Sequence, residues 1–295
     1  MSELNPTIST VDKLAYLPQR TDKSLGKLLL DAGKLTLRDI EAIERHQKVM
    51  GLRFGESAVE LGLVKEADIT QMLALQFDYP YLQSADGRYS QELVGAYQPF
   101  SPQVEAMRDL RSQLMLRWFD ADHRKLAVVG LGQGDGCSFL AANLAIVFSQ
   151  LGERTLLIDA NLRHPRQHVL FNLSQRRGLS DLLAGRATQE AIYKIPELVD
   201  LSVLPAGTIP PNPQELLGRP SFGRLLNELS SAYDVILLDT PSGQLYADMQ
   251  HIAAEAGAAL IVTRKHQTRL NQALALKKRI LDAKAQVVGA VLNEF

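Results

Sequence analysis

The sequence predicts an α/β protein with a mostly parallel β-sheet that has helices on both faces, preceded by a small all-α domain of helical repeats. Short apolar runs alternate with helical stretches through the second half of the chain, which is typical of such sheets. A glycine-rich segment follows the first apolar run, and the first 85 residues contain one helical pattern twice. We therefore expect a helical domain over residues 1–85, a linker over 86–103 and an α/β domain over 104–295.

The composition is that of a globular protein. Of its 295 residues, 46% are hydrophobic and 22% are charged, with 32 basic against 33 acidic side chains. A net charge of −1 argues against a nucleic-acid partner, and the single cysteine excludes an internal disulfide. No apolar run approaches the roughly 18 residues of a membrane-spanning helix, and the polar start lacks a signal-peptide pattern. We expect a cytoplasmic protein.

The helical domain is predicted from two copies of one pattern, Ser24 to Gln47 and Arg53 to Gln76. Each copy reads as two short helices, the first of which ends at a glycine. Neither copy can bury its apolar face alone, so we expect the two to pack together. Both copies have glycine at the third and tenth positions: Gly26 and Gly33, then Gly55 and Gly62.

Prolines interrupt the pattern between residues 77 and 103, where we expect a connection that partly packs on its neighbours. An amphipathic helix is then expected from Val104 to Asp120, and a further helix from Phe139 to Leu151. The expected strands are Lys125 to Val129, Arg154 to Ile158, Leu201 to Leu204, Val235 to Leu238, Ala258 to Val262 and Val287 to Leu292.

The glycine-rich segment between the first strand and the next helix carries the clearest chemical signal. Glycines let backbone N–H groups curl around an anion, and a helix N-terminus adds favourable partial charge. A phosphate loop ends in Gly-Lys-Ser/Thr, but here Cys137 replaces the lysine, and Leu131 stands where that pattern starts with glycine. A tight turn is one alternative, and a dinucleotide-binding loop, whose glycine pattern does not fit, is another. The phosphate-binding candidates are Gly132, Gln133, Gly134, Asp135, Gly136, Cys137 and Ser138.

Two aspartates end apolar strands, where ligands bind in open α/β sheets. Asp159 closes the second strand and Asp239 a later one. Mg²⁺ prefers oxygen ligands, so the Ser138 hydroxyl and the Asp239 carboxylate are its candidate ligands. Asp159 is then free to accept a proton from an attacking hydroxyl. The alternative is that both aspartates only cap helices.

These residues resemble the bacterial tyrosine kinases, relatives of the MinD/ParA nucleotide-binding proteins with a P-loop fold. The family has three motifs, and this sequence offers GQGDGCS, IDANLR and LDTP in the same order. PPNPQELL resembles the family's loop before a helix. The resemblance implies ATP-dependent protein-tyrosine phosphorylation with ATP/ADP and Mg²⁺. It also implies catalytic roles for Asp159, Arg163 and Asp239.

A helix upstream of the first strand resembles the one through which such kinases assemble into rings. Its charged residues are Glu105, Arg108 and Arg111, which share one helical face. The resemblance implies a homo-oligomer, and the alternative is a solvated charged face.

A narrower resemblance covers almost the whole chain. The chain is similar to EpsG-type chain-length-determinant tyrosine kinases of exopolysaccharide gene clusters in its helical repeats, FDYPYL, AYQPFSPQVEAMRDLRSQLMLRWF, PPNPQELL and the final VLNEF. This resemblance implies a regulator of exopolysaccharide biosynthesis and export. Its partner would be the cytoplasmic part of a Wzz-like inner-membrane protein, through which the chain would lie peripheral to that membrane.

Three departures from the kinase pattern bear on activity. Cys137 replaces the phosphate-binding lysine, Asn161 replaces the second aspartate of Asp-x-Asp, and no tyrosine follows Tyr246. A lost charge-assisted hydrogen bond costs about 1.5–3 kcal/mol of binding, whereas lost cationic stabilisation of phosphoryl transfer costs roughly 10³–10⁵ in rate. We therefore expect nucleotide to bind, and kinase activity to be weak or replaced by a scaffold role. A MinD/ParA-type ATPase switch is the further alternative.

The missing positive charge has candidate replacements. Arg163 would act within the chain, and Arg108 or Arg111 would act from a neighbouring subunit. Cys137 itself is interpreted as a small neutral residue, with a redox-sensitive thiol as the alternative.

The helical repeats resemble the MshE N-terminal domain of type II secretion ATPases, whose repeats bind cyclic di-GMP. Arg53, Gly26 and Gly55 are the residues that the resemblance assigns to that ligand. Arginine can stack on guanine and contact phosphate, and glycine permits close backbone approach. The first copy departs at Ser24, Lys34 and Glu44. The alternative is a docking domain whose repeats serve packing only.

Overall fold

The computed structural model describes residues 24–76, 82, 87–120, 122–173 and 177–294. The polar start of the chain and most of FDYPYL lie outside these residues. The chain divides into two compact units, Met1–Tyr79 and Pro80–Phe295. Each is described by itself.

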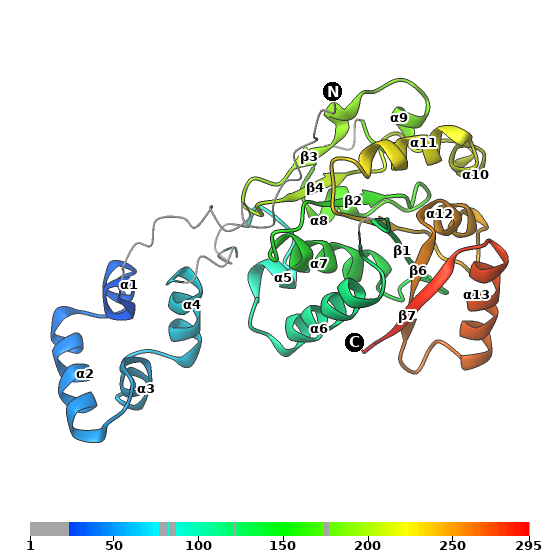
Figure 1. Ribbon diagram of the computed structural model, residues 1–295. Helices are drawn as coiled ribbons and strands as arrows, with labels where there is room; N and C mark the ends of the chain where they lie inside the picture. Colours follow the sequence, from blue (N-terminus) through cyan, green and yellow to red (C-terminus); the bar gives the residue numbers. More distant parts are fainter. Residues whose placement is uncertain (1–23, 77–81, 83–86, 121, 174–176, 295) are drawn as a thin grey trace, which may run out of the picture. The chain divides into compact units, whose positions relative to one another are not determined.

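The first unit contains two helices in each copy of the repeat, as predicted (Figure 1). They are α1 (Leu25–Asp31), α2 (Leu37–Met50), α3 (Phe54–Glu60) and α4 (Glu66–Gln76). Gly33 and Gly62 follow the first helix of each copy with φ of 66° and 67°, a left-handed conformation that glycine adopts without strain. The helices enclose a small core of Leu29, Leu35, Ile43, Ala58, Val64 and Met72.

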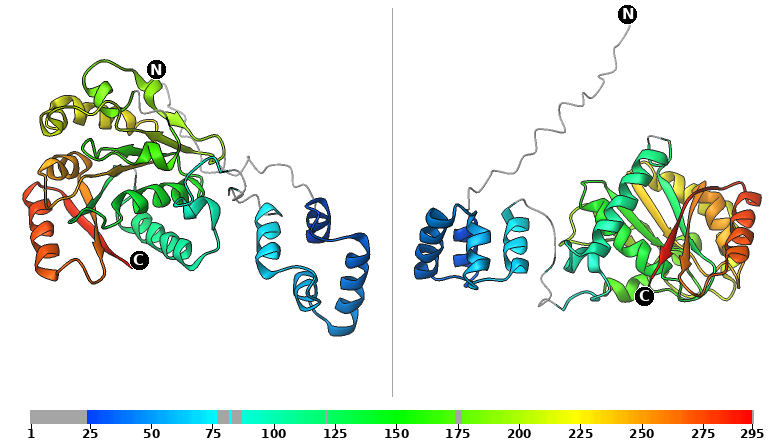
Figure 2. Two further views of the ribbon diagram at one scale, coloured as in Figure 1. Left: turned by 180° about the vertical axis from the view of Figure 1, so that it is seen from behind. Right: turned by 90° about the horizontal axis from the view of Figure 1, so that it is seen from below.

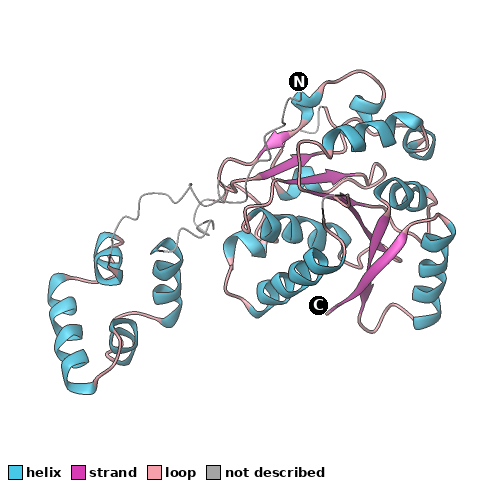
Figure 3. Ribbon diagram, viewed as in Figure 1, coloured by secondary structure: helices cyan, strands magenta, loops and turns pink. Residues whose placement is uncertain are grey.

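The second unit is a seven-stranded sheet between two helical layers (Figure 3). The strand order is β3-β4-β2-β5-β1-β6-β7, and the strand pairings are parallel except that of β3 with β4. The predicted parallel α/β fold is therefore confirmed. The strands are β1 (Lys125–Gly130), β2 (Thr155–Asp159), β3 (Tyr193–Lys194), β4 (Leu201–Leu204), β5 (Val235–Asp239), β6 (Ala258–Arg264) and β7 (Gln286–Asn293).

Alternate side chains of each strand pack against opposite helical layers. Leu126 and Val128 of β1 join the core with α6 and α7, whereas Ala127 and Val129 join the core with α11 and α12. Figure 2 shows these layers from two further sides. The helices are α5 (Val94–Tyr97), α6 (Pro102–Arg117), α7 (Cys137–Ser149), α8 (Gln167–Leu170), α9 (Leu179–Leu183), α10 (Pro213–Leu217), α11 (Pro220–Leu229), α12 (Asp248–Ala256) and α13 (Leu270–Asp282), with a 3₁₀ turn, η3, at Gln189–Ala191.

Two features differ from the sequence expectation. Strand β3 was not expected, because two residues are too short for any periodicity to show. The segment assigned to a linker, 86–103, packs against α7: Gly95 N donates to Asn143 Oδ1 at 2.8 Å, and Leu93 and Ala96 are fully buried. It is therefore part of the second unit.

Candidate nucleotide-binding site

The glycine-rich loop joins β1 to α7 and takes the shape of an anion cradle. Gly134 and Gly136 have φ of 88° and 93°, left-handed values that glycine adopts without strain, and the helix begins at Cys137. Gly132 N donates to Asp135 Oδ2 at 2.7 Å, which braces the loop from within. Among the described residues, none accepts a hydrogen bond from the backbone N–H groups of residues 133–136. These donors remain available for a ligand.

Strands β6 and β7 hold the side of the loop that faces away from the cleft. Arg264 at the end of β6 donates to Gly134 O at 3.1 Å, and Asn293 of β7 donates to Asp135 O at 3.1 Å. Neither residue lines the cleft on the other side of the loop. The loop is therefore fixed before any ligand arrives.

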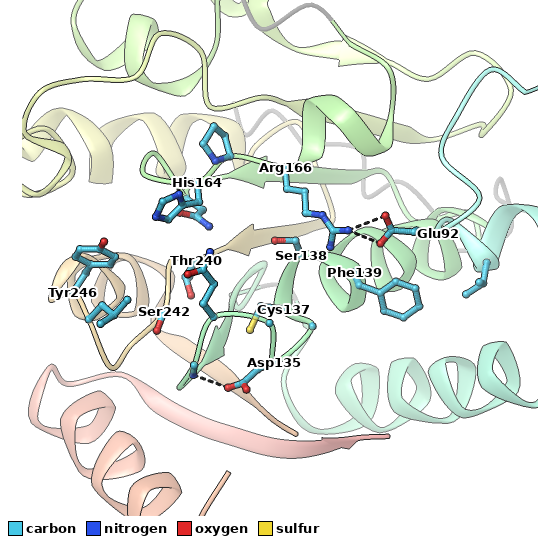
Figure 4. A pocket seen from close by; sticks show the side chains of 18 of the residues that line it. Glu92, Asp135, Cys137, Ser138, Phe139, His164, Arg166, Thr240, Ser242 and Tyr246 are labelled. Carbon is cyan, nitrogen blue, oxygen red and sulfur yellow. Dashed lines mark hydrogen bonds and ion pairs between the residues drawn. The ribbon is translucent and has the colours of Figure 1, made fainter. Parts of the chain in front are cut away.

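A cleft of about 980 Å³ opens above the loop, at the carboxyl ends of the strands (Figure 4). The loops after β1, β2 and β5 form its walls, together with the segment before α5. Ligands bind at this edge of open α/β sheets. Its lining includes all seven loop candidates, with Glu92, Asn161, His164, Arg166, Thr240, Ser242 and Tyr246.

Asp159 and Asp239 are fully buried beneath this lining. Asp159 Oδ2 accepts from the backbone N–H groups of Arg166 and Gln167, both at 2.9 Å, and Oδ1 accepts from Asn161 N at 3.2 Å. Burial and the Asp239 carboxylate raise the pKa of Asp159 well above its usual range. In this structure Asp159 holds the loop after β2, the helix-capping role left open by the sequence.

Asp239 has the surroundings that a Mg²⁺ ligand needs. Gln167 Nε2 donates to Asp239 Oδ2 at 2.8 Å, while Oδ1 is buried without a hydrogen-bond partner among the described residues. Burial raises its pKa to about 6, and the hydrogen bonds from Gln167 and Ser138 oppose that shift. The orphaned oxygen and the Ser138 hydroxyl fit the ion. No group of three or more His, Cys, Asp or Glu side chains in the described residues could hold a metal.

Cys137 is the first residue of α7 and packs inward. A Cβ on Gly130 would collide with the Cys137 sulfur, so the thiol fills the space beside β1. Burial, Asp239 and Asp135 together raise the pKa of the thiol well above its usual range. The structure therefore favours the small neutral residue over the redox-sensitive thiol, which needs a lowered pKa.

Arg163 is engaged elsewhere. Its Nε and Nη2 contact the buried carboxylate of Asp248 at 2.6 and 3.1 Å, and its guanidinium lies 4.0 Å from the centre of the Tyr246 ring. Arg163 does not line the cleft. The arrangement makes it a tether between the loop after β2 and α12, and its catalytic role stays a prediction.

The charged face of α6 is tied to its own unit. Glu105 and Arg108 pair with each other, and Arg111 donates to Val147 O at 2.5 Å. Burial lowers the pKa of Arg111. A homo-oligomer formed through these residues stays a prediction.

In the first unit, the two glycines assigned to cyclic di-GMP lie at helix contacts. A Cβ would stand 3.0 Å from Phe54 at Gly26 and 2.9 Å from Ile69 at Gly55, so both glycines permit close helix packing. Lys34, a departure from the repeat pattern, pairs with Asp68 of the second copy at 2.9 Å. Arg53 is exposed at the start of α3.

Sequence reasoning missed Arg166, Gln167 and Glu92. Arg166 and Gln167 follow Asp159 closely in the chain, so their place after a strand was a usable signal. Glu92 reaches the cleft only because its segment docks on α7, which no local pattern shows.

A glycine loop between the first parallel strand and its helix, with acidic residues ending two neighbouring strands, defines an α/β protein of the P-loop class. Residues 123–290 match the family model described as cellulose biosynthesis protein BcsQ. Tyrosine-protein kinase YwqD of Bacillus subtilis is 32% identical over 206 residues, covering 70% of this chain and 87% of YwqD. Tyrosine-protein kinase Wzc of Salmonella typhimurium is 35% identical over 209 residues, covering 70% of this chain.

The solved kinase domain of Escherichia coli tyrosine kinase ETK has the same fold. Its TM-score is 0.66 at 28% identity, over 73% of this chain and 88% of that one. The chain belongs to the bacterial tyrosine-protein kinase family. It spans 29% of the length of Wzc. No helix in the described ranges has both the length and the apolarity to span a membrane.

Proposed function

We propose that the chain binds MgATP in the cleft and transfers the γ-phosphoryl group to tyrosine hydroxyls, slowly, as a regulator of exopolysaccharide biosynthesis, export and chain length. The observation that carries the proposal is the combination of free loop amides with the orphaned Asp239 Oδ1. The amides would hold the phosphate oxygens. Asp239 and Ser138 would hold Mg²⁺, which neutralises charge that develops on the phosphates.

Phosphoryl transfer would proceed by exchange of one P–O bond for another. The tyrosine oxygen would bond to the γ-phosphorus, the bond from that phosphorus to the bridging oxygen of ADP would break, and the phenolic proton would pass to the Asp159 carboxylate. The raised pKa of Asp159 supports its assignment as the proton acceptor.

The neutral thiol at position 137 supports a slow enzyme. No lysine lines the cleft among the described residues, and such a cation contributes roughly 10³–10⁵ in rate. The second candidate function, a non-catalytic nucleotide-dependent scaffold, draws on the same observation. A kinase would phosphorylate tyrosine, a scaffold would bind MgATP without turnover, and an ATPase switch of the MinD/ParA type would couple hydrolysis to dimer formation.

The proposed cellular role follows the family. The matching family model is that of a cellulose biosynthesis protein, and cellulose is a polysaccharide. The sequence resemblance supports a Wzz-like inner-membrane protein as partner, with this chain on its cytoplasmic side, and the first unit as a regulatory domain that binds cyclic di-GMP through the exposed Arg53.

Calorimetry with MgATP and labelled phosphotransfer to a Glu/Tyr copolymer test this function. We expect micromolar MgATP binding, weak tyrosine phosphorylation, and loss of phosphorylation in Asp159→Asn with binding kept. Absence of MgATP binding would refute the nucleotide site. Binding without any phosphotransfer would leave the scaffold, and equal phosphotransfer in Asp159→Asn would remove the proton-acceptor role.

A further inference from the structure

Arg166 lines the cleft whose phosphate loop has Cys137 in place of a lysine. Its backbone N–H is fixed by Asp159 Oδ2 at 2.9 Å, and its side chain extends over the start of α7, near Ser138 (Figure 4). Among the described residues that line the cleft, Arg166 is the only arginine or lysine. Its charge also lowers the pKa of Asp239 at the cleft floor, so its field reaches the candidate Mg²⁺ site.

One carboxylate holds Arg166 in place. Arg166 Nη2 contacts Glu92 Oε1 and Oε2 at 2.7 and 2.6 Å, and the two side chains are 44% and 45% exposed. Its remaining guanidinium N–H groups make no hydrogen bond with a described residue. A half-exposed ion pair is weak, so a triphosphate with several negative charges can compete for this guanidinium.

Glu92 is itself positioned by the helix that follows the loop. Asn143 of α7 donates to Glu92 O at 2.9 Å and accepts from Gly95 N at 2.8 Å. The ion pair therefore stands on the cleft wall, beside α7. The other arginines named above are occupied: Arg163 by Asp248, and Arg264 by the outer side of the loop.

We propose that Arg166 supplies the positive charge that Cys137 withholds from the phosphate loop, with Glu92 as its counter-ion when no nucleotide is bound. The proposal rests on the proposed function, because it assigns the phosphate-binding cation of the same site. In the complex, Arg166 exchanges the Glu92 carboxylate for phosphate oxygens. Glu92 is then the competitor that weakens binding.

Calorimetry on the full chain with MgATP and with adenosine tests this assignment. Arg166→Ala should weaken MgATP binding about 10- to 100-fold, the range expected for one charge-assisted hydrogen bond, and leave adenosine binding unchanged. Glu92→Gln should tighten MgATP binding about threefold because the competing charge is gone. The matched control is Arg154→Ala, which removes an arginine that pairs with Asp234 at the opposite end of β2.

A rescue variant separates a charge effect from a structural one. Cys137→Lys in the Arg166→Ala background should restore at least half of the lost free energy of MgATP binding. A merely structural role of Arg166 would not allow this rescue. Equal MgATP affinity in wild type and Arg166→Ala, or no rescue by Cys137→Lys, would overturn the assignment while the proposed function stands. A wild-type protein that binds no MgATP would overturn both.

Discussion

Asp159 and Asp239 are register partners at the carboxyl ends of the paired strands β2 and β5, and both side chains are fully buried. Burial raises the pKa of each, and the charge of Asp239 raises that of Asp159 further. Folding therefore disfavours ionisation of the two carboxylates on which the proposed chemistry depends. A bound cation would favour their ionised forms.

Asp239→Asn should stabilise the nucleotide-free protein at neutral pH. A pKa raised from 3.8 to about 6 corresponds to a cost on the order of 3 kcal/mol for ionising Asp239 in the folded state. Because the pKa of Asp239 is higher in the folded than in the unfolded protein, protonation of Asp239 stabilises the folded state at low pH. Wild type loses this contribution as the pH rises from about 4 through about 6. Urea unfolding between pH 4.5 and 7.5 should show a gap between variant and wild type that widens up to pH 6 and then levels off.

Asp234→Asn is the control with the opposite sign. The hydrogen bond from Arg154 is the main cause that lowers the pKa of Asp234. The ionised Asp234 therefore stabilises the folded protein above the unfolded pKa, and this contribution is lost as the pH falls. Asp234→Asn should therefore destabilise the protein at neutral pH. A gap between Asp239→Asn and wild type that does not change with pH would contradict the burial argument.

Mg²⁺ should strengthen ATP binding only where Asp239 is ionised. Since the pKa of Asp239 is raised to about 6, the enhancement of ATP affinity by Mg²⁺ should be full near pH 7.5. It should begin to fall as the pH drops through about 6, and by up to tenfold per pH unit below that pKa. Calorimetry with and without Mg²⁺ at pH 5, 6 and 7.5 measures it, with Asp239→Asn as the variant that should show no enhancement at any pH. An enhancement that survives in Asp239→Asn would exclude this carboxylate as the ligand.

The strands and the loop were predictable because their signals are local. Apolar runs such as Val235 to Leu238 indicate buried parallel strands, and Gly134 and Gly136 indicate a loop that needs positive φ. The sheet order then brings Asp159 and Asp239 together, as expected from their place at strand ends.

Side-chain partnerships were not predictable in the same way. Arg163 follows the family pattern, yet its partner Asp248 lies 85 positions further along the chain, and nothing local shows that pairing. Arg166 meets Glu92 across 74 positions. Sequence patterns specify which element a residue belongs to, whereas the partner of a long flexible side chain depends on tertiary packing.

The cyclic di-GMP assignment of the first unit rests on Arg53, because the packing of Gly26 and Gly55 has its own explanation in helix contacts. Titration of cyclic di-GMP into the full chain should give heat in wild type and at least tenfold weaker binding in Arg53→Ala, since the guanidinium would contact phosphate or guanine. Arg38→Ala on the exposed surface of α2 is the control. Equal affinity in Arg53→Ala, or no heat in wild type at high micromolar ligand, would leave packing as the role of the repeats.

Arg163→Ala should destabilise the protein more than it weakens nucleotide binding. Asp248 is fully buried, so loss of its partner leaves an uncompensated carboxylate, which costs about 3–5 kcal/mol for a fully buried pair. Arg163 is 24% exposed, so we expect about 2–4 kcal/mol. Asp248→Asn added to Arg163→Ala removes the orphaned charge and should recover more than half of that loss in urea unfolding.

MgATP affinity, measured at a temperature where Arg163→Ala is folded, should stay within about threefold of wild type, because Arg163 does not line the cleft. A tenfold loss of affinity or of phosphotransfer, with stability kept, would instead make Arg163 a catalytic residue, as the family pattern implies.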